Sequence, residues 1–131
     1  MKFIAQRQHY RKTAVHIKGR ILEAKIADTF FKKVAGLMYL PQQKESECML
    51  FVFRFSGSQG IWMRSMKFPI DAIWLDASNR IVHIEESMQP CMSINCKIYA
   101  SSKDAKYVIE LRDGFVKRNG IKIKDVAEFS L

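Results

Sequence analysis

The segment from residue 62 to residue 76 holds the densest group of side chains that could bind a small molecule. It combines an indole ring, a guanidinium and two carboxylates around a proline, and these residues are Trp62, Arg64, Pro69, Asp71 and Asp76. Pro69 has no backbone N–H, so a sheet hydrogen bond is missing beside it and a carbonyl is left free. We therefore expect a ligand pocket in which Asp71 is less than half exposed, at the rim of a concavity with Trp62 and Arg64. The alternative is structural: Trp62 is core, Arg64 pairs with Asp71, and Asp76 starts a turn.

No motif identifies catalytic residues. The glycines at 57 and 60 lack the Gly-Lys-Ser/Thr ending of a phosphate loop, and the sequence contains no G-x-S-x-G. Cys91 could act as a nucleophile only if the fold pairs it with a base such as His83. These observations favour a binding or accessory module for a small ligand, a peptide or an acidic partner, without a cofactor. The alternative is a small hydrolase or transferase that uses the segment from Trp62 to Asp71.

Positive charge is concentrated near the N-terminus. The chain carries a net charge of +9, and residues 1–25 hold seven basic residues against one acidic residue, a net of +6. Arg7, Tyr10, Arg11 and Lys12 could meet nucleic acid, because cations release counterions from phosphates and a tyrosine ring can stack on a base. An acidic partner would suit the same charge. The alternative is a solvated tail followed by a basic strand face.

The three cysteines, Cys48, Cys91 and Cys96, are too few for a disulfide scaffold. The spacing of Cys91 and Cys96 permits a bridge, but free thiols are expected in a reducing cytosol. A structural zinc site needs about four ligands, usually as two close pairs. Only one close cysteine pair is present, so no metal is expected.

No segment has the length and apolar character of a membrane-spanning helix. The longest wholly apolar run is residues 49–53, far short of the roughly 20 residues that a span needs. The first residues, MKFIAQR, lack the apolar stretch of a signal peptide. We therefore expect a cytoplasmic protein without a membrane span.

Hydrophobic periodicity predicts one good helix and several short strands. An N-cap at residues 28–29 precedes four apolar residues that share one helical face, namely Phe30, Val34, Leu37 and Met38. Alternating or continuous apolar stretches predict a hairpin over residues 13–27 and strands over 49–53, 61–64, 70–75, 80–86, 105–111 and parts of 121–131.

These elements predict a single mainly β (α+β) domain over residues 13–131 of the 131-residue chain. The expected fold is a small antiparallel β-barrel-like domain, with one peripheral helix near residues 28–39 that covers an open end. Residues 1–12 are expected to form a basic arm or an edge strand.

Ten short segments resemble, in order along the chain, the family called domain of unknown function 192 (DUF192). They are Ala27–Thr29, Gly36–Met38, Met49–Phe53, Trp62-Met63, Pro69–Asp71, Ile73–Asp76, Tyr107–Leu111, Gly114, Gly120-Ile121 and Asp125. The resemblance runs from about residue 15 to residue 129. It implies a compact β-barrel-like domain with a peripheral helix, and it implies no established activity, substrate, cofactor or catalytic residue.

The chain departs from the family pattern at three places. Cys48 stands where the family usually has Gly, residues 64–66 (Arg-Ser-Met) stand in place of Lys-Asn-Thr, and Lys124 replaces another Gly. A site that depended on the family's Asn amide after the Trp-Met pair is therefore not expected in this chain.

Overall fold

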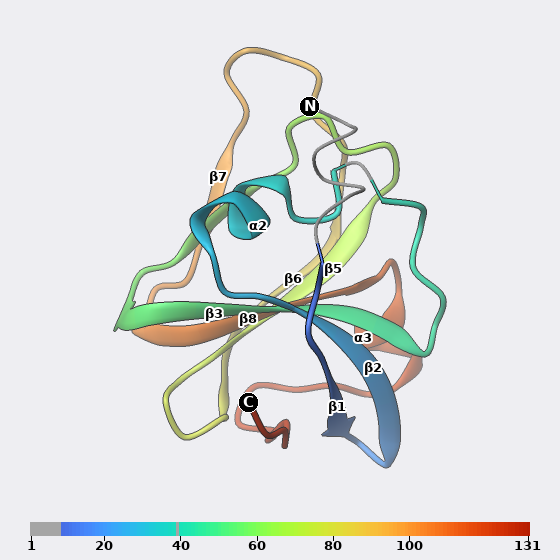
Figure 1. Cartoon of the computed structure of the whole chain (residues 1–131), viewed down its shortest axis with the longest axis vertical. Coiled ribbons are helices and arrows are strands. Elements are labelled where there is room, and N and C mark those ends of the chain that lie inside the picture. Colours follow the sequence, from blue (N-terminus) through green and yellow to red (C-terminus); the bar gives the residue numbers. More distant parts are fainter. Residues whose placement is uncertain (1–8, 39) are drawn as a thin grey trace.

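The computed structural model describes residues 9–38 and 40–131, which form a mainly β structure with two short helices (Figure 1). The elements are β1 (Lys12–Ile17), β2 (Arg20–Ala27), α2 (Phe30–Ala35), β3 (Glu47–Gly57), β4 (Gly60–Trp62), β5 (Ile70–Leu75), β6 (Ile81–Met88), β7 (Ile98–Ala100), β8 (Ala105–Arg112) and α3 (Phe115–Arg118). Neither helix of this described part is long and apolar enough to cross a membrane.

Six strands form one mixed sheet in the order β1-β2-β3-β8-β5-β6. Neighbouring strands are antiparallel except for β2 and β3, which run parallel. The short strands β4 and β7 pair only with each other, as a separate antiparallel ribbon. Strand β8 therefore lies at the centre of the main sheet, between β3 and β5.

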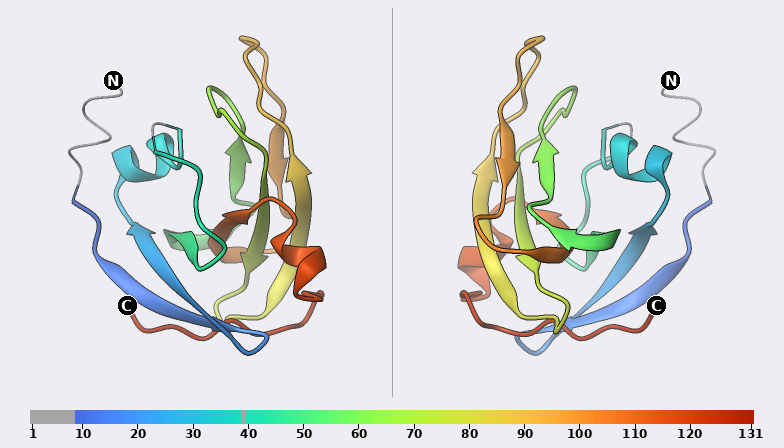
Figure 2. Two further views of the ribbon diagram at one scale, coloured as in Figure 1. Left: turned by 90° about the vertical axis from the view of Figure 1, so that its right-hand side faces the viewer. Right: turned by 90° about the vertical axis from the view of Figure 1, so that its left-hand side faces the viewer.

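The sheet is not closed into the antiparallel barrel that the sequence led us to expect. The connection from β2 to β3 contains α2 and carries the chain back to the start of β2, so these two strands run parallel. Residues 121–131 were expected to add strands, but they make only isolated bridges. Glu128 exchanges backbone hydrogen bonds with His16 of β1 (2.8 and 2.9 Å), and Ala127 N donates to the carbonyl oxygen of Asn79, in the turn before β6 (3.0 Å). This segment runs along one end of the molecule between the two edge strands (Figure 2).

Apolar side chains pack on both faces of the sheet. Strand β5 is buried along its whole length, because its alternate residues enter different cores. Ile73 and Leu75 pack with Phe115 of α3 on one face. Trp74 packs on the other face, where the core also contains Leu37, just after α2. The two faces of β5 and β8 therefore point to different regions of the protein.

Helix α2 is shorter than predicted and its expected apolar face is not buried. Thr29 caps its first turn by accepting a hydrogen bond from Lys32 N (3.2 Å), as predicted for an N-cap. Gly36 ends the helix with φ of 48°, a left-handed value that glycine tolerates best. Because the chain turns there, Leu37 enters the core whereas Phe30 and Val34 stay 74% and 46% exposed.

Candidate ligand-binding pocket

A cavity of about 400 Å³ lies between α2 and the β4–β7 ribbon. Helix α2 and the residues after it form one wall, and β4 with Ile98 of β7 forms another. Phe51 and Phe53 of β3 and Glu110 of β8 complete the lining. Figure 2 shows α2 standing opposite the β4–β7 ribbon across this region. Most of the lining is apolar, as is usual for sites that enclose small molecules.

Glu110 places a buried carboxyl in this apolar lining. The residue is 5% exposed, and its Oε1 atom has no hydrogen-bond partner among the described residues. Burial raises the pKa of Glu110 to about 8, because the apolar surroundings disfavour the charged form. At neutral pH the carboxyl is therefore mostly protonated, and it can donate as well as accept a hydrogen bond.

The position of Glu110 follows from the sheet. On the central strand β8 it pairs with Met49 of β3 and Ala72 of β5. Its backbone carbonyl accepts a hydrogen bond from Gln43 Nε2 (3.1 Å). Its side chain leaves the sheet on the same face as Val108, toward Gly36 at the end of α2. A strand that is paired on both sides at this position thus holds the carboxyl.

Two cations line the cavity with Glu110. The guanidinium of Arg64 lies 5.5 Å from the ring centroid of Trp62, and the Nζ atom of Lys33 lies 4.9 Å from the ring centroid of Phe53. Lys33 also donates a hydrogen bond to Val52 O (3.2 Å). Cations at this distance are attracted to the negative faces of aromatic rings.

Trp62 and Arg64, two of the predicted site residues, therefore lie together at the cavity. Trp62 is 38% exposed, so the alternative that it belongs to the core is wrong. Within the described part of the chain, Arg64 is exposed and makes no ion pair with Asp71.

Asp71 does not share this concavity, which corrects the prediction for the rim. It is fully buried on the opposite face of β5, where its carboxylate accepts hydrogen bonds from Ser87 N (2.8 Å) and Val116 N (2.9 Å). Asp71 pairs across the sheet with Leu111, whereas Glu110 pairs with Ala72, so the two acidic side chains leave the sheet on opposite faces. Asp71 thus joins β6 and α3 to β5.

The remaining residues of the predicted pocket also lie outside the cavity lining. Asp76 Oδ1 accepts hydrogen bonds from Ser78 N (2.9 Å) and Arg80 N (3.0 Å), which is the turn role that we considered as the alternative. Pro69 is half-buried and immediately precedes β5, which begins at Ile70. Neither side chain is brought to Trp62 and Arg64 at the lining.

The basic N-terminal candidates are arranged differently from the prediction. Arg7 lies outside the described residues. Tyr10 is only 8% exposed and packs in the core, so its ring is not free to stack on a base. Arg11 forms an ion pair with Asp28 (2.5 Å) and Lys12 with Glu23 (3.2 Å). Lys12 is the first residue of the edge strand β1.

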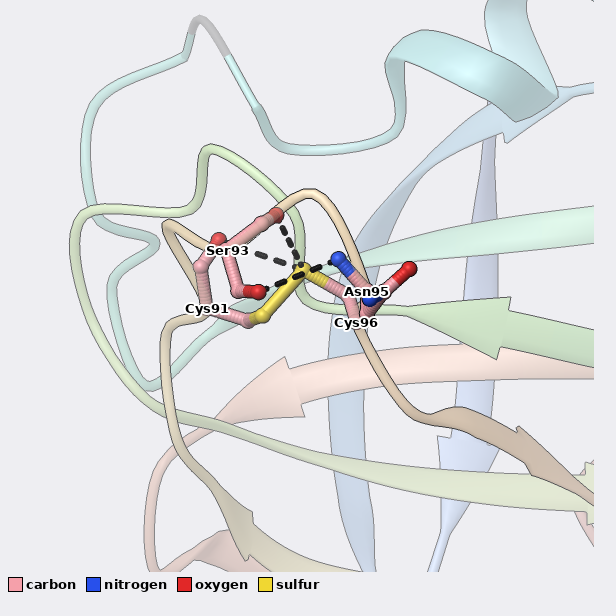
Figure 3. The surroundings of a disulfide bond; sticks show 4 residues. All are labelled: Cys91, Ser93, Asn95 and Cys96. Atoms are coloured by element: carbon pink, nitrogen blue, oxygen red, sulfur yellow. Dashed lines mark hydrogen bonds between the residues drawn. A yellow bond between two sulfur atoms is a disulfide. The ribbon is translucent and has the colours of Figure 1, made fainter.

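Cys91 and Cys96 form a disulfide, contrary to the expectation of free thiols (Figure 3). Their Cα atoms are 5.9 Å apart, inside the usual range for a bridge, and the turn that brings them together could not be read from spacing alone. Cys91 is therefore not a free nucleophile beside His83, whose Nε2 atom lies 2.8 Å from Glu85. The third thiol, Cys48, is free, and burial raises its pKa to about 12.

The disulfide loop is joined to the cavity wall. Cys91 N donates to Met63 O (3.0 Å), and Ser65 N donates to Cys91 O (3.1 Å). These two bonds flank Arg64 in the sequence. The bridge therefore helps to fix the backbone that carries the Arg64 guanidinium.

Sequence reasoning missed Glu110. In the strand predicted over residues 105–111, alternation puts Glu110 on the face opposite Ile109 and Leu111, which is the exposed face if the strand is half-buried. The available signal was its position between apolar neighbours on both sides, in the run Val108-Ile109-Glu110-Leu111. A carboxylate in such a run requires an explanation, because burial of an unpaired charge is costly.

Curated relatives match most of the chain. A UPF0127 protein from Thermococcus kodakarensis is 27% identical over 108 residues, which cover 82% of this chain and 65% of the relative. The chain thus spans just under two thirds of that relative. A UPF0127 protein from Thermococcus gammatolerans is 28% identical over 118 residues, which cover 87% of this chain and 72% of the relative.

Two crystal structures share the fold. One, from Sinorhizobium meliloti 1021, is described as a proposed transcription regulator and has a TM-score of 0.85 at 30% identity, over 93% of this chain and 96% of that chain. The other is a protein of unknown function from Novosphingobium aromaticivorans, with a TM-score of 0.80 at 23% identity, over 91% and 84% of the two chains. The DUF192 family, described as an uncharacterised ACR, matches residues 13–129. The chain therefore belongs to the DUF192 family.

Proposed function

We propose that this protein is a binding module that encloses the apolar part of a small molecule in the cavity between α2 and the β4–β7 ribbon. The observation that carries the proposal is the carboxyl of Glu110, which is buried in the lining without a hydrogen-bond partner for Oε1 among the described residues. A buried polar atom left unpaired costs about 1–3 kcal/mol. A ligand with one polar group near the floor of the cavity would recover that free energy.

The mouth of the cavity supports the same function. Phe30, Val34, Trp62 and Ile98 all line it, and they are 74%, 46%, 38% and 57% exposed. Clustered exposed apolar side chains commonly mark a binding site. A ligand that covers them gains about 25 cal/mol for each Å² of apolar surface removed from water.

The chemistry of the lining favours binding over the alternative of a small hydrolase or transferase. None of the described lining residues is Ser, Thr, Cys or His, so the cavity offers no side-chain nucleophile of those types. Asp71, the acid on which that alternative depended, accepts a hydrogen bond from Val116 N on the other face of the sheet. Glu110 is the acidic residue of the lining, and binding needs no second one.

A fluorescence titration with N-phenyl-1-naphthylamine, an apolar dye that brightens on leaving water, tests the proposal. Ala35, which lines the cavity, is replaced by Phe to fill it, and Ala77, exposed in the β5–β6 turn, receives the same substitution as a control. We expect saturable binding to the native protein and the Ala77→Phe variant, and little binding to Ala35→Phe. Undiminished binding to a folded Ala35→Phe variant would contradict the proposal.

A second pair of variants keeps the test informative if Ala35→Phe destabilises the helix. Phe30 and Phe31 are neighbours on α2 with similar exposure, 74% and 70%, but Phe30 lines the cavity and Phe31 does not. Phe30→Ala should weaken dye binding several-fold, whereas Phe31→Ala should not. Equal effects of the two substitutions would place the dye on the outside of the helix.

Nucleic-acid binding through the basic N-terminal segment is a second candidate. Its support is the net charge of +9 and the description of the Sinorhizobium meliloti relative as a proposed transcription regulator. The burial of Tyr10 and the ion pairs of Arg11 and Lys12 count against it. An acidic protein partner is a further form of the same proposal.

A cytoplasmic location stays a proposal. The Cys91–Cys96 disulfide counts against it, because such bridges persist mainly in oxidising compartments. Alkylation of the protein isolated from its native cell under acid quench would determine the redox state of this pair.

A further inference from the structure

We propose that the cavity selects small monoanions with an apolar body, and that Arg64 recognises their acidic group at the mouth. This inference rests on the proposed function, since it names the class of ligand that the cavity would take.

Among the described lining residues, the basic side chains outnumber the acidic ones. Lys33 and Arg64 are cations, and Glu110 is the one acidic residue among them. Glu110 is buried, whereas Arg64 is exposed to solvent. The positive charges therefore act where a ligand enters, and a cationic ligand would meet two like charges there.

The backbone beside Arg64 is held in place, and the side-chain donors of Arg64 are free within the described residues. Its guanidinium lies 5.5 Å from the Trp62 ring centroid, and the backbone on both sides is held by the hydrogen bonds that join Met63 and Ser65 to Cys91. No hydrogen bond or ion pair occupies its side-chain N–H groups within the described residues. A guanidinium held in this way can donate two parallel hydrogen bonds to one carboxylate or sulfonate.

Lys33 is engaged differently. Its Nζ atom donates to Val52 O (3.2 Å) and lies against Phe53 (4.9 Å). Recognition of an anion by Lys33 would require these contacts to change. We therefore assign the direct contact to Arg64 and a supporting positive field to Lys33.

The floor of the cavity is compatible with an anionic ligand at neutral pH. Burial raises the pKa of Glu110 to about 8, so the carboxyl is mostly neutral there and does not repel a negative group at the mouth. The protonated carboxyl can donate its O–H to an acceptor on the ligand body. The apolar side chains between floor and mouth would contact that body.

Two dyes that differ by one charged group test the assignment. N-phenyl-1-naphthylamine and 8-anilinonaphthalene-1-sulfonate share the same aromatic skeleton, and only the second carries a sulfonate. Their dissociation constants are measured at pH 7 for the native protein, Arg64→Met and Arg54→Met. Arg54 is the matched control, because it also lies over an aromatic ring, Phe55 (5.6 Å), but does not line the cavity.

We expect Arg64→Met to weaken binding of the sulfonate dye by roughly three- to tenfold, the range of a partly exposed charge-assisted contact, and to change binding of the neutral dye less than twofold. Arg54→Met should change neither constant by more than twofold. Added salt should weaken sulfonate binding to the native protein more than to Arg64→Met. Arg64→Lys should bind the sulfonate dye with an affinity between those of the native protein and Arg64→Met. Lysine keeps the positive charge but lacks the two parallel N–H donors of the guanidinium.

The two proposals fail in different ways. Equal effects of Arg64→Met on both dyes, or no effect on either, would overturn the selection of anions. The proposed pocket would still be supported if Ala35→Phe blocks dye binding. If Ala35→Phe leaves the binding of both dyes unchanged, the pocket itself is not the site and the proposed function fails. Tighter binding of the sulfonate dye to Arg64→Met would contradict the role of Arg64 directly.

Discussion

Gly36 and Glu110 meet at the inner end of α2: a Cβ atom added to Gly36 would lie 3.6 Å from Oε1 of Glu110. The same atom would lie 3.3 Å from Cζ of Phe51, a tight contact. The missing side chain of Gly36 thus lets the end of the helix approach the carboxyl. This approach contributes to the burial that raises the pKa of Glu110.

Replacement of Gly36 by Ala should destabilise the protein by about 1–3 kcal/mol. The left-handed φ of 48° disfavours any residue with a Cβ, and the close contact with Phe51 adds strain. Gly120→Ala is the matched control, since Gly120 also has a positive φ (61°) but no atom within 4 Å of the added carbon. Urea unfolding measures both. A smaller loss for Gly36→Ala than for Gly120→Ala would contradict the close packing.

The stability of the protein should fall as the pH rises from about 5 to 9. The folded-state pKa of Glu110, about 8, lies above its ordinary value of 4.5, so between these values the folded state holds more protons than the unfolded state. Stability then decreases with rising pH. One pKa unit corresponds to about 1.4 kcal/mol, so the total loss is on the order of a few kcal/mol. Burial of the carboxyl is the cause of this pKa shift, although Lys33 and Arg64 line the same cavity.

Glu110→Gln provides the control for this pH dependence. The amide has the shape of the carboxyl and does not titrate, so the variant should be more stable than the native protein at pH 9 and similar at pH 5. Chemical unfolding at several pH values measures the difference. A pH profile unchanged by Glu110→Gln would mean that other groups cause the slope.

The sequence allowed accurate prediction where local chemistry sets an element's limits. Strand β5 was expected over residues 70–75 and is observed at Ile70–Leu75, because Pro69 and the turn at Asp76 bound it. Helix α2 was predicted too long, since the apolar periodicity continues past Gly36, where the backbone turns.

The candidate site could be predicted only in part, for a physical reason. An alternating pattern shows that the two faces of a strand differ, but it does not show that both are covered. Strands β5 and β8 have a core on each face. Asp71 and Glu110 are therefore both buried, but their side chains lie on opposite faces of the sheet. Only the packing of the sheet shows that Glu110, not Asp71, lies with Trp62 and Arg64 at the cavity.

Asp71→Asn should destabilise the protein by about 2–4 kcal/mol without changing dye binding. Each carboxylate oxygen accepts a backbone hydrogen bond, from Ser87 and from Val116, and an amide can replace only one of these acceptors. Asp104→Asn, at an exposed position, serves as the control for a surface carboxylate and should have little effect. If a stable, folded Asp71→Asn variant loses binding of both dyes, the structural role assigned to Asp71 is wrong.

Loss of the Cys91–Cys96 bridge should lower stability and weaken anion binding together. The loop of a few residues that it closes corresponds to roughly 2 kcal/mol in the chain-entropy treatment of disulfides. The Cys91→Ser/Cys96→Ser variant should also bind the sulfonate dye less tightly, because the loop holds the backbone around Arg64. Binding of the neutral dye should change less. Dithiothreitol should reproduce these effects in the native protein and add nothing in the double variant.

The nucleic-acid proposal makes a prediction about salt that can be tested without disturbing the fold. Arg11→Ala/Lys12→Ala removes two exposed cations and leaves the buried Tyr10 in place, whereas deletion of residues 1–12 would also remove that core side chain. The lost ion pairs, with Asp28 and Glu23, are exposed, so the change in stability should be under about 1 kcal/mol.

If residues 11 and 12 contact phosphates, the logarithm of the association constant for a DNA duplex falls with the logarithm of salt by about 0.9 for each contact. The double variant should then reduce this slope by up to about two and weaken binding at low salt. Lys44→Ala/Lys103→Ala, two exposed lysines elsewhere in the chain, is the matched control for loss of two positive charges and should leave the slope nearly unchanged. Binding that is absent, independent of salt, or reduced equally by both double variants would leave only the general effect of the net charge of +9.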